Sequence, residues 1–141
     1  MWLAGHSCYK RGMNRTALNR ALAERIAAVL GLLGVALGAF GAHGLSQTLA
    51  QFGTAEIWEK AVLYHFIHAL AMFLLTQRAP FRKGPWVCFL IGIVLFSGSL
   101  YVMAASNARW LGAATPFGGI SFLSGWSWLA VSGSAGHGED R

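Results

Sequence analysis

The sequence predicts an all-α fold: an integral membrane bundle of four transmembrane helices with both termini in the cytoplasm. Apolar residues make up 55% of the 141-residue chain, and charged residues only 11%. A soluble domain contains about 25% charged residues, so most of this chain is too apolar to face water. The apolar residues also gather in long runs, and about 20 such residues are enough for a helix to cross a membrane.

Four runs are expected to span the membrane, at about residues 26–43, 57–76, 85–105 and 115–132. The first carries no charge, and the third is strongly apolar throughout. The fourth is the weakest because it is rich in glycine and serine, but it also carries no charge. We expect one transmembrane domain over residues 21–132, after a disordered basic extension at 1–20 and before a short polar tail at 133–141.

Residues that favour helix ends flank these runs. Gly44 follows the first run and suits the left-handed backbone conformation that closes many helices. Thr54 is expected to cap the second helix, and Pro85 suits the first turn of the third. Thr115 followed by Pro116 predicts the start of the fourth helix. Local signals therefore support the boundaries that hydropathy predicts.

The basic residues predict the orientation of the bundle. Five of the eleven lysines and arginines lie in the first 25 residues, and three more lie between residues 78 and 83. The loop at 44–57 has none, and the loop after the third run has only Arg109. Basic loops stay in the cytoplasm, so both termini are expected there. Because these bases mark helix ends, no nucleic-acid partner is expected despite the net charge of +6.

The first residues allow more than one interpretation. A basic flank and small residues near the end of the first run fit a cleaved signal peptide, but three further spans argue against cleavage. The first 23 residues are basic and free of acids, as in a mitochondrial transit peptide. We favour a simpler interpretation, in which Met13 is the true start and Met1 results from gene prediction. The expected location is the bacterial inner (plasma) membrane, or a mitochondrial membrane in a eukaryote.

Small residues predict close helix packing. In the first run, Ala27 and four glycines recur at spacings of 4, 3, 4 and 3, which places them on one face. Lipid gives helices no hydrophobic reason to associate, so close backbone approach through small residues takes that role. Serine and glycine four residues apart repeat the pattern in the fourth run. The glycines expected at helix contacts are Gly31, Gly34, Gly38, Gly41, Gly118, Gly119 and Gly125.

Two histidines inside the second run are the strongest candidates for chemistry. His65 and His68 are three residues apart, so they share a helix face that is expected to point into the bundle. An ionisable group within a span indicates a functional site by default. The structural alternative is a neutral imidazole hydrogen-bonded to a neighbouring helix, because burial favours the uncharged form. His43 has a simpler interpretation at the last turn of its helix, where the dipole favours a partly charged imidazole.

The depth of the polar residues predicts a pocket. At 1.5 Å per residue, the polar side chains of all four spans fall in the outer half of the membrane, and the cytoplasmic halves are almost purely apolar. We expect a polar pocket open to the outside. Its expected lining is His43, Tyr64, His65, His68, Ser99 and Tyr101.

Four motifs carry a resemblance to a known family: GAFGAHGL, WEKAVLYHFIHALA, FSGSLY and TPFGGISFLSGW. In this order they make the chain similar to the membrane proteins of domain of unknown function 423, related to transmembrane protein 256 homologues. The resemblance implies a four-helix bundle in the bacterial inner membrane and no assigned activity. The family's recurring positions map onto Gly38, Gly41, His43, Gly44, Trp58, Tyr64, His68, Gly98, Tyr101, Pro116, Gly118, Gly119 and Trp126.

Three functions fit these observations. The first is a non-enzymatic bundle that binds a lipid, a small ligand or a partner protein, or that forms homo-oligomers. The second is a small transporter or channel that uses the histidines, although no carboxylate is expected deep in the membrane, because Glu56 and Glu59 are interfacial. The third is a redox accessory subunit holding haem or quinone, for which the histidine geometry is poor. The sequence contains no set of catalytic residues, no phosphate-binding loop and no metal-ligand spacing, so no enzyme activity, cofactor or metal is expected. The two cysteines, Cys8 and Cys88, predict no disulfide.

Overall fold

The computed structural model describes the backbone of residues 3–133 and the side chains of residues 19–132. Within this part the chain is helical, as predicted, and contains no strand. A π-helical turn at Ile93–Ser97 joins α4 to α5, and a 3₁₀ turn at Arg109–Ala113 precedes the last helix. The α-helices are α1 (Leu3–His43), α2 (Ser46–Phe52), α3 (Ala55–Gln77), α4 (Lys83–Gly92), α5 (Gly98–Ser106) and α6 (Thr115–Gly133).

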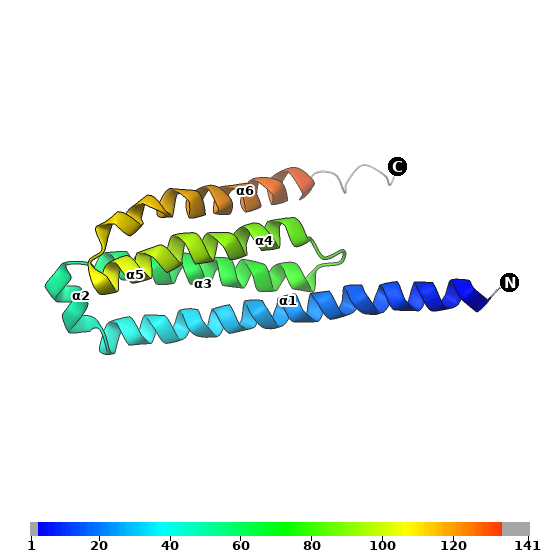
Figure 1. Cartoon of the computed structure of the whole chain (residues 1–141), viewed down its shortest axis with the longest axis horizontal. Coiled ribbons are helices and arrows are strands. Elements are labelled where there is room, and N and C mark those ends of the chain that lie inside the picture. Colours follow the sequence, from blue (N-terminus) through cyan, green and yellow to red (C-terminus); the bar gives the residue numbers. More distant parts are fainter. Residues whose placement is uncertain (1–2, 134–141) are drawn as a thin grey trace.

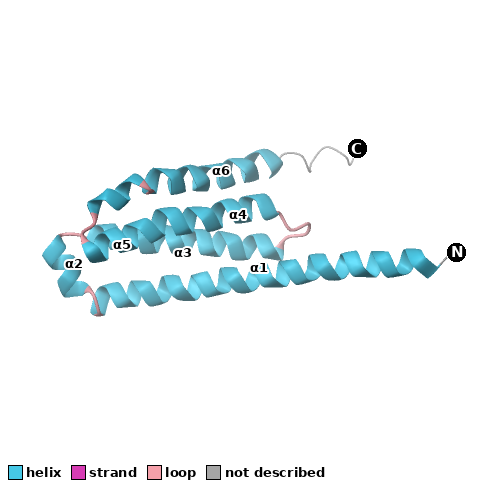
Figure 2. Ribbon diagram, in the orientation of Figure 1, coloured by secondary structure: helices cyan, strands magenta, loops and turns pink. Residues whose placement is uncertain are grey.

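The long helices lie side by side in an open arrangement (Figures 1 and 2). α1 packs on α3, and α6 packs on α4. α3 and the helix formed by α4, the π turn and α5 contact each other and lie between α1 and α6 (Figure 1). The N-terminal part of α1 extends beyond the other helices. α1 therefore has one major neighbour, and most of its circumference is free of protein contact over the described residues.

The predicted runs match the observed helices closely at three of the four positions. α3, the α4–α5 helix and α6 each begin and end within two residues of the expected bounds. α1 ends at His43 as expected but begins at Leu3, so it is helical through the basic segment for which we expect disorder. Residues 13–30 contain no glycine or proline and many alanines and leucines, which explains why the helix is continuous there.

Two helices among the described residues are long and apolar enough to cross a membrane, Asn19–His43 and Lys83–Ser106. The other two long helices are less apolar for identifiable reasons. α3 carries charged residues in its first turns and His65 and His68 further along. α6 is rich in glycine and serine.

Several helix ends differ from the expected caps. Thr54 stands at the start of α3 but caps nothing, because its hydroxyl donates to the Ala104 carbonyl of α5 at 2.8 Å. Thr115 is the first residue of α6, and its hydroxyl pairs with that of Ser99 at 3.2 Å. Gly44 does not adopt a positive φ, whereas Gly53, which closes α2, does. Threonine hydroxyls here join neighbouring helices, which is how polar groups are satisfied where water is absent.

The glycines pack helices together at most of the expected positions. A Cβ at Gly41 would overlap the Trp58 indole of α3, and one at Gly118 would overlap the backbone of Phe96. A Cβ at Gly38 would lie 3.3 Å from Val62 of α3. Gly31 differs, because nothing lies within 4 Å of the space where its Cβ would be. Within the glycine face of α1, Gly34, Gly38 and Gly41 therefore pack on α3, whereas Gly31 does not.

Candidate functional site

His68 uses both of its ring nitrogens within the bundle. Its Nδ1 lies 2.7 Å from the backbone carbonyl of Tyr64, which can only accept, so Nδ1 carries the hydrogen. Its Nε2 lies 3.1 Å from the indole Nε1–H of Trp126, which can only donate, so Nε2 accepts. The two bonds together assign the neutral imidazole with its proton on Nδ1. Neither nitrogen remains free for a ligand.

Aromatic rings enclose the same imidazole. The His68 ring stacks on Phe122 of α6, with centroids 3.5 Å apart and planes inclined by 13°. Phe89 of α4 meets it edge-on, with centroids 5.3 Å apart. His68 is only 4% exposed. This side chain therefore joins α3 to α4 and α6 by packing as well as by hydrogen bonds.

His65 is equally buried, at 4% exposed, but only one of its nitrogens is paired. Nδ1 shares a hydrogen bond of 3.3 Å with the hydroxyl of Tyr101 on α5. Nε2 has no hydrogen-bond partner, although the Leu30 carbonyl of α1 approaches the ring without the geometry of a bond. Its Cδ2 faces Gly34, close to the position of an absent Cβ. His65 therefore keeps one buried ring nitrogen, Nε2, without a hydrogen bond of ordinary geometry.

The remaining candidate residues lie in separate places. Ser99 is buried, and its hydroxyl bonds to the Phe96 carbonyl at 2.9 Å and to Thr115. Tyr64 is exposed on the side of α3, with its ring against Phe96. His43 is exposed at the end of α1, where its carbonyl accepts from the hydroxyl of Ser46. The structure brings together His65 with Tyr101 and His68 with Tyr64, but not all six around one space.

A cavity does lie near the end of the bundle that the sequence predicts to be outside, with a different lining. Its volume is about 270 Å³, and it lies between α1 and α3. Glycines at 38 and 41 leave room on the α1 side, and Trp58 closes one wall by donating its Nε1–H to the Leu37 carbonyl at 3.0 Å. Glu59 is the one charged residue in the lining. We call this cavity the outer groove, which is lined by Gly38, Gly41, Ala42, Trp58, Glu59, Val62 and Leu63.

Several residues of these sites were not expected as site residues. Phe122 and Trp126 are four apart on α6 and reach the His68 ring together. Their i, i+4 spacing places them on one face, a signal that the sequence contains. Trp58 was expected as a family position and Glu59 as an interfacial charge, and their place in a groove depends on the partner helix. No three histidine, cysteine or acidic side chains among the residues described are grouped closely enough to share a metal ion.

Comparisons with known proteins identify the family. The family model described as "Protein of unknown function (DUF423)" matches residues 37–119. The chain is 40% identical over 112 residues to UPF0382 membrane protein SH2409 of Staphylococcus haemolyticus, covering 76% of this chain and 90% of the relative. It is 40% identical over 114 residues to UPF0382 membrane protein YwdK of Bacillus subtilis, covering 76% and 91%.

A relative from Escherichia coli indicates the membrane. The chain is 44% identical over 112 residues to UPF0382 inner membrane protein YgdD of strain K12, covering 74% of this chain and 83% of the relative. No solved structure matches the chain. These relatives assign the chain to the bacterial inner membrane. With the motifs, the helical fold and the matched residues in agreement, the chain belongs to the DUF423 (UPF0382) family of uncharacterised membrane proteins.

Proposed function

We propose that the chain crosses the inner membrane four times, with both termini in the cytoplasm. The length of the helices supports this, since the 23 residues of α3 and the 19 residues of α6 extend roughly 35 Å and 28 Å at 1.5 Å per residue. Both helices fall within the range of about 17–25 residues that crosses a hydrocarbon core of about 30 Å. The charges agree, because Arg20 and Arg25 lie at the same end of the bundle as the loop with Arg78 and Arg82.

Reporter fusions test this topology. Alkaline phosphatase is active only outside the cytoplasm, so a fusion after Asn107 is expected to be active. Fusions after Pro80 and after Arg141 are expected to be inactive, and a fluorescent protein at Arg141 is expected to fluoresce. An active phosphatase at Arg141 would contradict an even number of spans, and an inactive fusion at Asn107 would contradict the proposed orientation.

We infer further that the protein acts by binding rather than by catalysis. The outer groove carries this proposal, because it combines apolar walls with one carboxylate, that of Glu59. One turn further into the bundle from Val62 lies His65, whose Nε2 is unpaired. A small apolar molecule with a polar or cationic head fits this pattern of groups. Its apolar part would lie against Trp58 and Leu63 and its head near Glu59.

The histidines support the other two functions less well. A proton relay or a haem ligand needs an imidazole nitrogen that is free to exchange protons or to coordinate. His68 would first have to break its bonds to Tyr64 and Trp126. Of the two buried histidines among the described residues, only His65 keeps a ring nitrogen without a hydrogen bond, and the exposed His43 lies at the end of α1. The arrangement therefore favours a binding role for the bundle.

Native mass spectrometry of protein released from detergent micelles tests the groove. The wild type is expected to carry additional mass of a few hundred daltons, which Ala42→Leu removes by filling the groove. Glu59→Gln is expected to weaken retention by removing the charge. Ala39→Leu is the matched control, because Ala39 is an equally exposed alanine of α1 that does not line the groove.

The mass itself distinguishes the occupants. A second copy or a partner protein would add kilodaltons instead, and loss of that species in Ala42→Leu would make the groove a protein interface. Bare wild-type protein would argue against the proposal, as would a ligand that Ala42→Leu and Ala39→Leu retain equally.

A further inference from the structure

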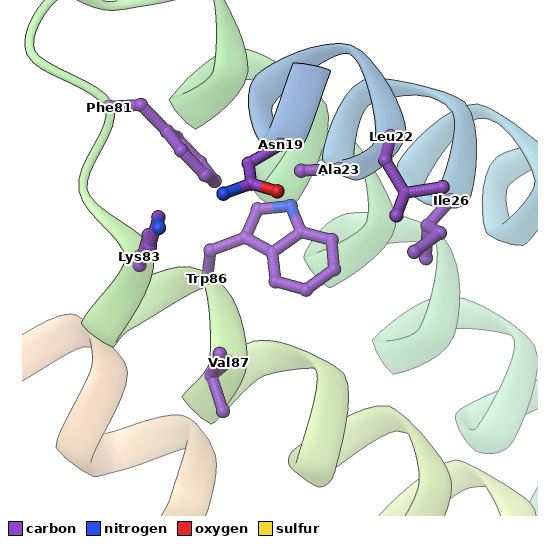
Figure 3. Close-up of a pocket in the computed structure, with 8 residues that line it drawn as sticks. All are labelled: Asn19, Leu22, Ala23, Ile26, Phe81, Lys83, Trp86 and Val87. Atoms are coloured by element: carbon purple, nitrogen blue, oxygen red, sulfur yellow. The ribbon is translucent and has the colours of Figure 1, made fainter. Parts of the chain in front are cut away.

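A second cavity lies at the opposite end of the bundle, where α1 passes the start of α4 (Figure 3). Its volume is about 330 Å³. α1 has no extensive contact with α4, so the space between them is open on one side. We call it the inner groove, which is lined by Asn19, Leu22, Ala23, Ile26, Phe81, Lys83, Trp86 and Val87.

The inner groove contains a buried donor without an acceptor. Trp86 is 7% exposed, and its indole Nε1–H has no hydrogen-bond partner. Figure 3 shows the indole in the middle of the groove, with the nitrogen-bearing edge of the ring turned toward Asn19 of α1. A buried donor that remains unpaired is unfavourable, and an acceptor from outside the chain would relieve it. The groove is therefore suited to a ligand that carries acceptor oxygens.

The charge of this end favours an anionic ligand. Lys83 lies at the mouth of the groove and is exposed. Arg20 and Arg25 lie on the neighbouring turns of α1. No acidic residue lines the groove. The nearby acid, Glu24, accepts a hydrogen bond from Gln77 of α3.

The position of the groove favours a lipid over a soluble anion. The apolar helix Lys83–Ser106 begins at Lys83, and the uncharged run of α1 begins at Ile26, directly after Arg25. Both Lys83 and Ile26 line the groove. The groove therefore lies where the apolar segments start, at the depth of the lipid headgroups. Its outward walls are apolar, since Leu22 is 56% exposed and Val87 is 44% exposed. An acyl chain can lie against these side chains below a headgroup held at the mouth.

We propose that the inner groove binds one anionic phospholipid of the adjacent leaflet. Lys83 pairs with the phosphate, and the Nε1–H of Trp86 donates to a phosphate or ester oxygen. The amide of Asn19 provides a further donor from α1. One acyl chain lies along Leu22 and Val87. Basic pockets between membrane helices take anionic lipids in this way. This site is independent of the outer groove and of the function proposed for it.

The test is a lipid titration of the purified full chain, followed by native mass spectrometry. Phosphatidylglycerol is the probe, phosphatidylcholine is the zwitterionic comparison, and glycerol 3-phosphate is the soluble headgroup. The wild type is expected to retain one phosphatidylglycerol about tenfold more tightly than phosphatidylcholine. Trp86→Phe and Lys83→Gln are each expected to weaken that lipid about tenfold, the effect of one charge-assisted hydrogen bond or ion pair.

Matched controls separate the site from general effects. Trp110→Phe and Lys60→Gln replace the same residue types at exposed positions outside the groove, and they are expected to leave retention unchanged. If Trp86→Phe fails to fold, Lys83→Gln and Asn19→Ala address the same site with exposed side chains. Equal retention of the two lipids, or equal loss in Lys60→Gln and Lys83→Gln, would overturn the proposal. Saturable binding of glycerol 3-phosphate that displaces the lipid would replace it with a soluble anion site.

Discussion

Gly118→Ala is expected to lower the stability of the bundle by about 1–3 kcal/mol, the usual effect of adding a methyl group to a tightly packed contact. A Cβ at this position would overlap the backbone nitrogen and Cα of Phe96 in the π turn. Backbone atoms cannot rotate aside as a side chain can, so α6 must move away from the helix formed by α4, the π turn and α5. Unfolding of the detergent-solubilised protein, followed by circular dichroism at 222 nm, measures the change.

Gly31→Ala is the matched control for this prediction. Gly31 also lies within a long helix, but nothing within 4 Å would meet its Cβ. Alanine favours the helix over glycine by roughly 0.5–1 kcal/mol, so this variant is expected to be as stable as the wild type or more so. If both substitutions lowered the stability equally, the close packing of α6 on the π turn would not be the cause of the effect at Gly118.

His68→Phe is expected to destabilise the protein by about 1–3 kcal/mol while leaving ligand retention in the outer groove intact. Phenylalanine keeps a planar ring against Phe122 but removes the acceptor for Trp126. The indole N–H then remains unpaired, and this loss dominates the expected effect. The same unfolding measurement by circular dichroism tests the prediction.

A double-mutant cycle with Trp126→Phe isolates the bond. The coupling energy is expected to fall at about 0.6–1.7 kcal/mol, the range found for hydrogen bonds between membrane helices. Trp126 is 46% exposed, so its substitution alone disturbs little packing. Full stability of His68→Phe combined with loss of bound ligand would refute the structural role and make His68 a binding group.

The helices were predictable because their signals are local. Long apolar runs predicted three of the helices within two residues of their bounds, and Pro85 lies in the first turn of α4 as expected. The caps were less predictable, since Thr54 and Thr115 resemble N-caps in sequence but bond to α5 instead. Whether a threonine hydroxyl caps its own helix or bonds to another helix depends on which helix lies opposite. The spacing of residues within one segment does not predict this. The short helix α2 lay within a segment interpreted only as a loop.

The candidate site was predictable in part for the same reason. The i, i+3 spacing of His65 and His68 correctly predicts that both face the interior. It does not predict that one ring is fully bonded while the other keeps a free nitrogen, because that depends on Trp126 and Tyr101 from other helices. Depth along each span placed polar residues at one level of the membrane. Whether these residues line one space depends on how each helix is rotated about its own axis, and depth along the helix does not determine that rotation.

The π turn at Ile93–Ser97 sets that rotation for the helix that joins α4 to α5. Phe89 and Tyr101 are twelve residues apart, and in an unbroken α-helix their directions would differ by about 120°. One additional residue in a wider turn reduces the difference to about 20°. Both rings consequently meet histidines of α3, with Phe89 5.3 Å from His68 and Tyr101 6.0 Å from His65 between centroids. The π turn therefore brings two aromatic rings from either side of it to the same face of the helix, where each meets one buried imidazole.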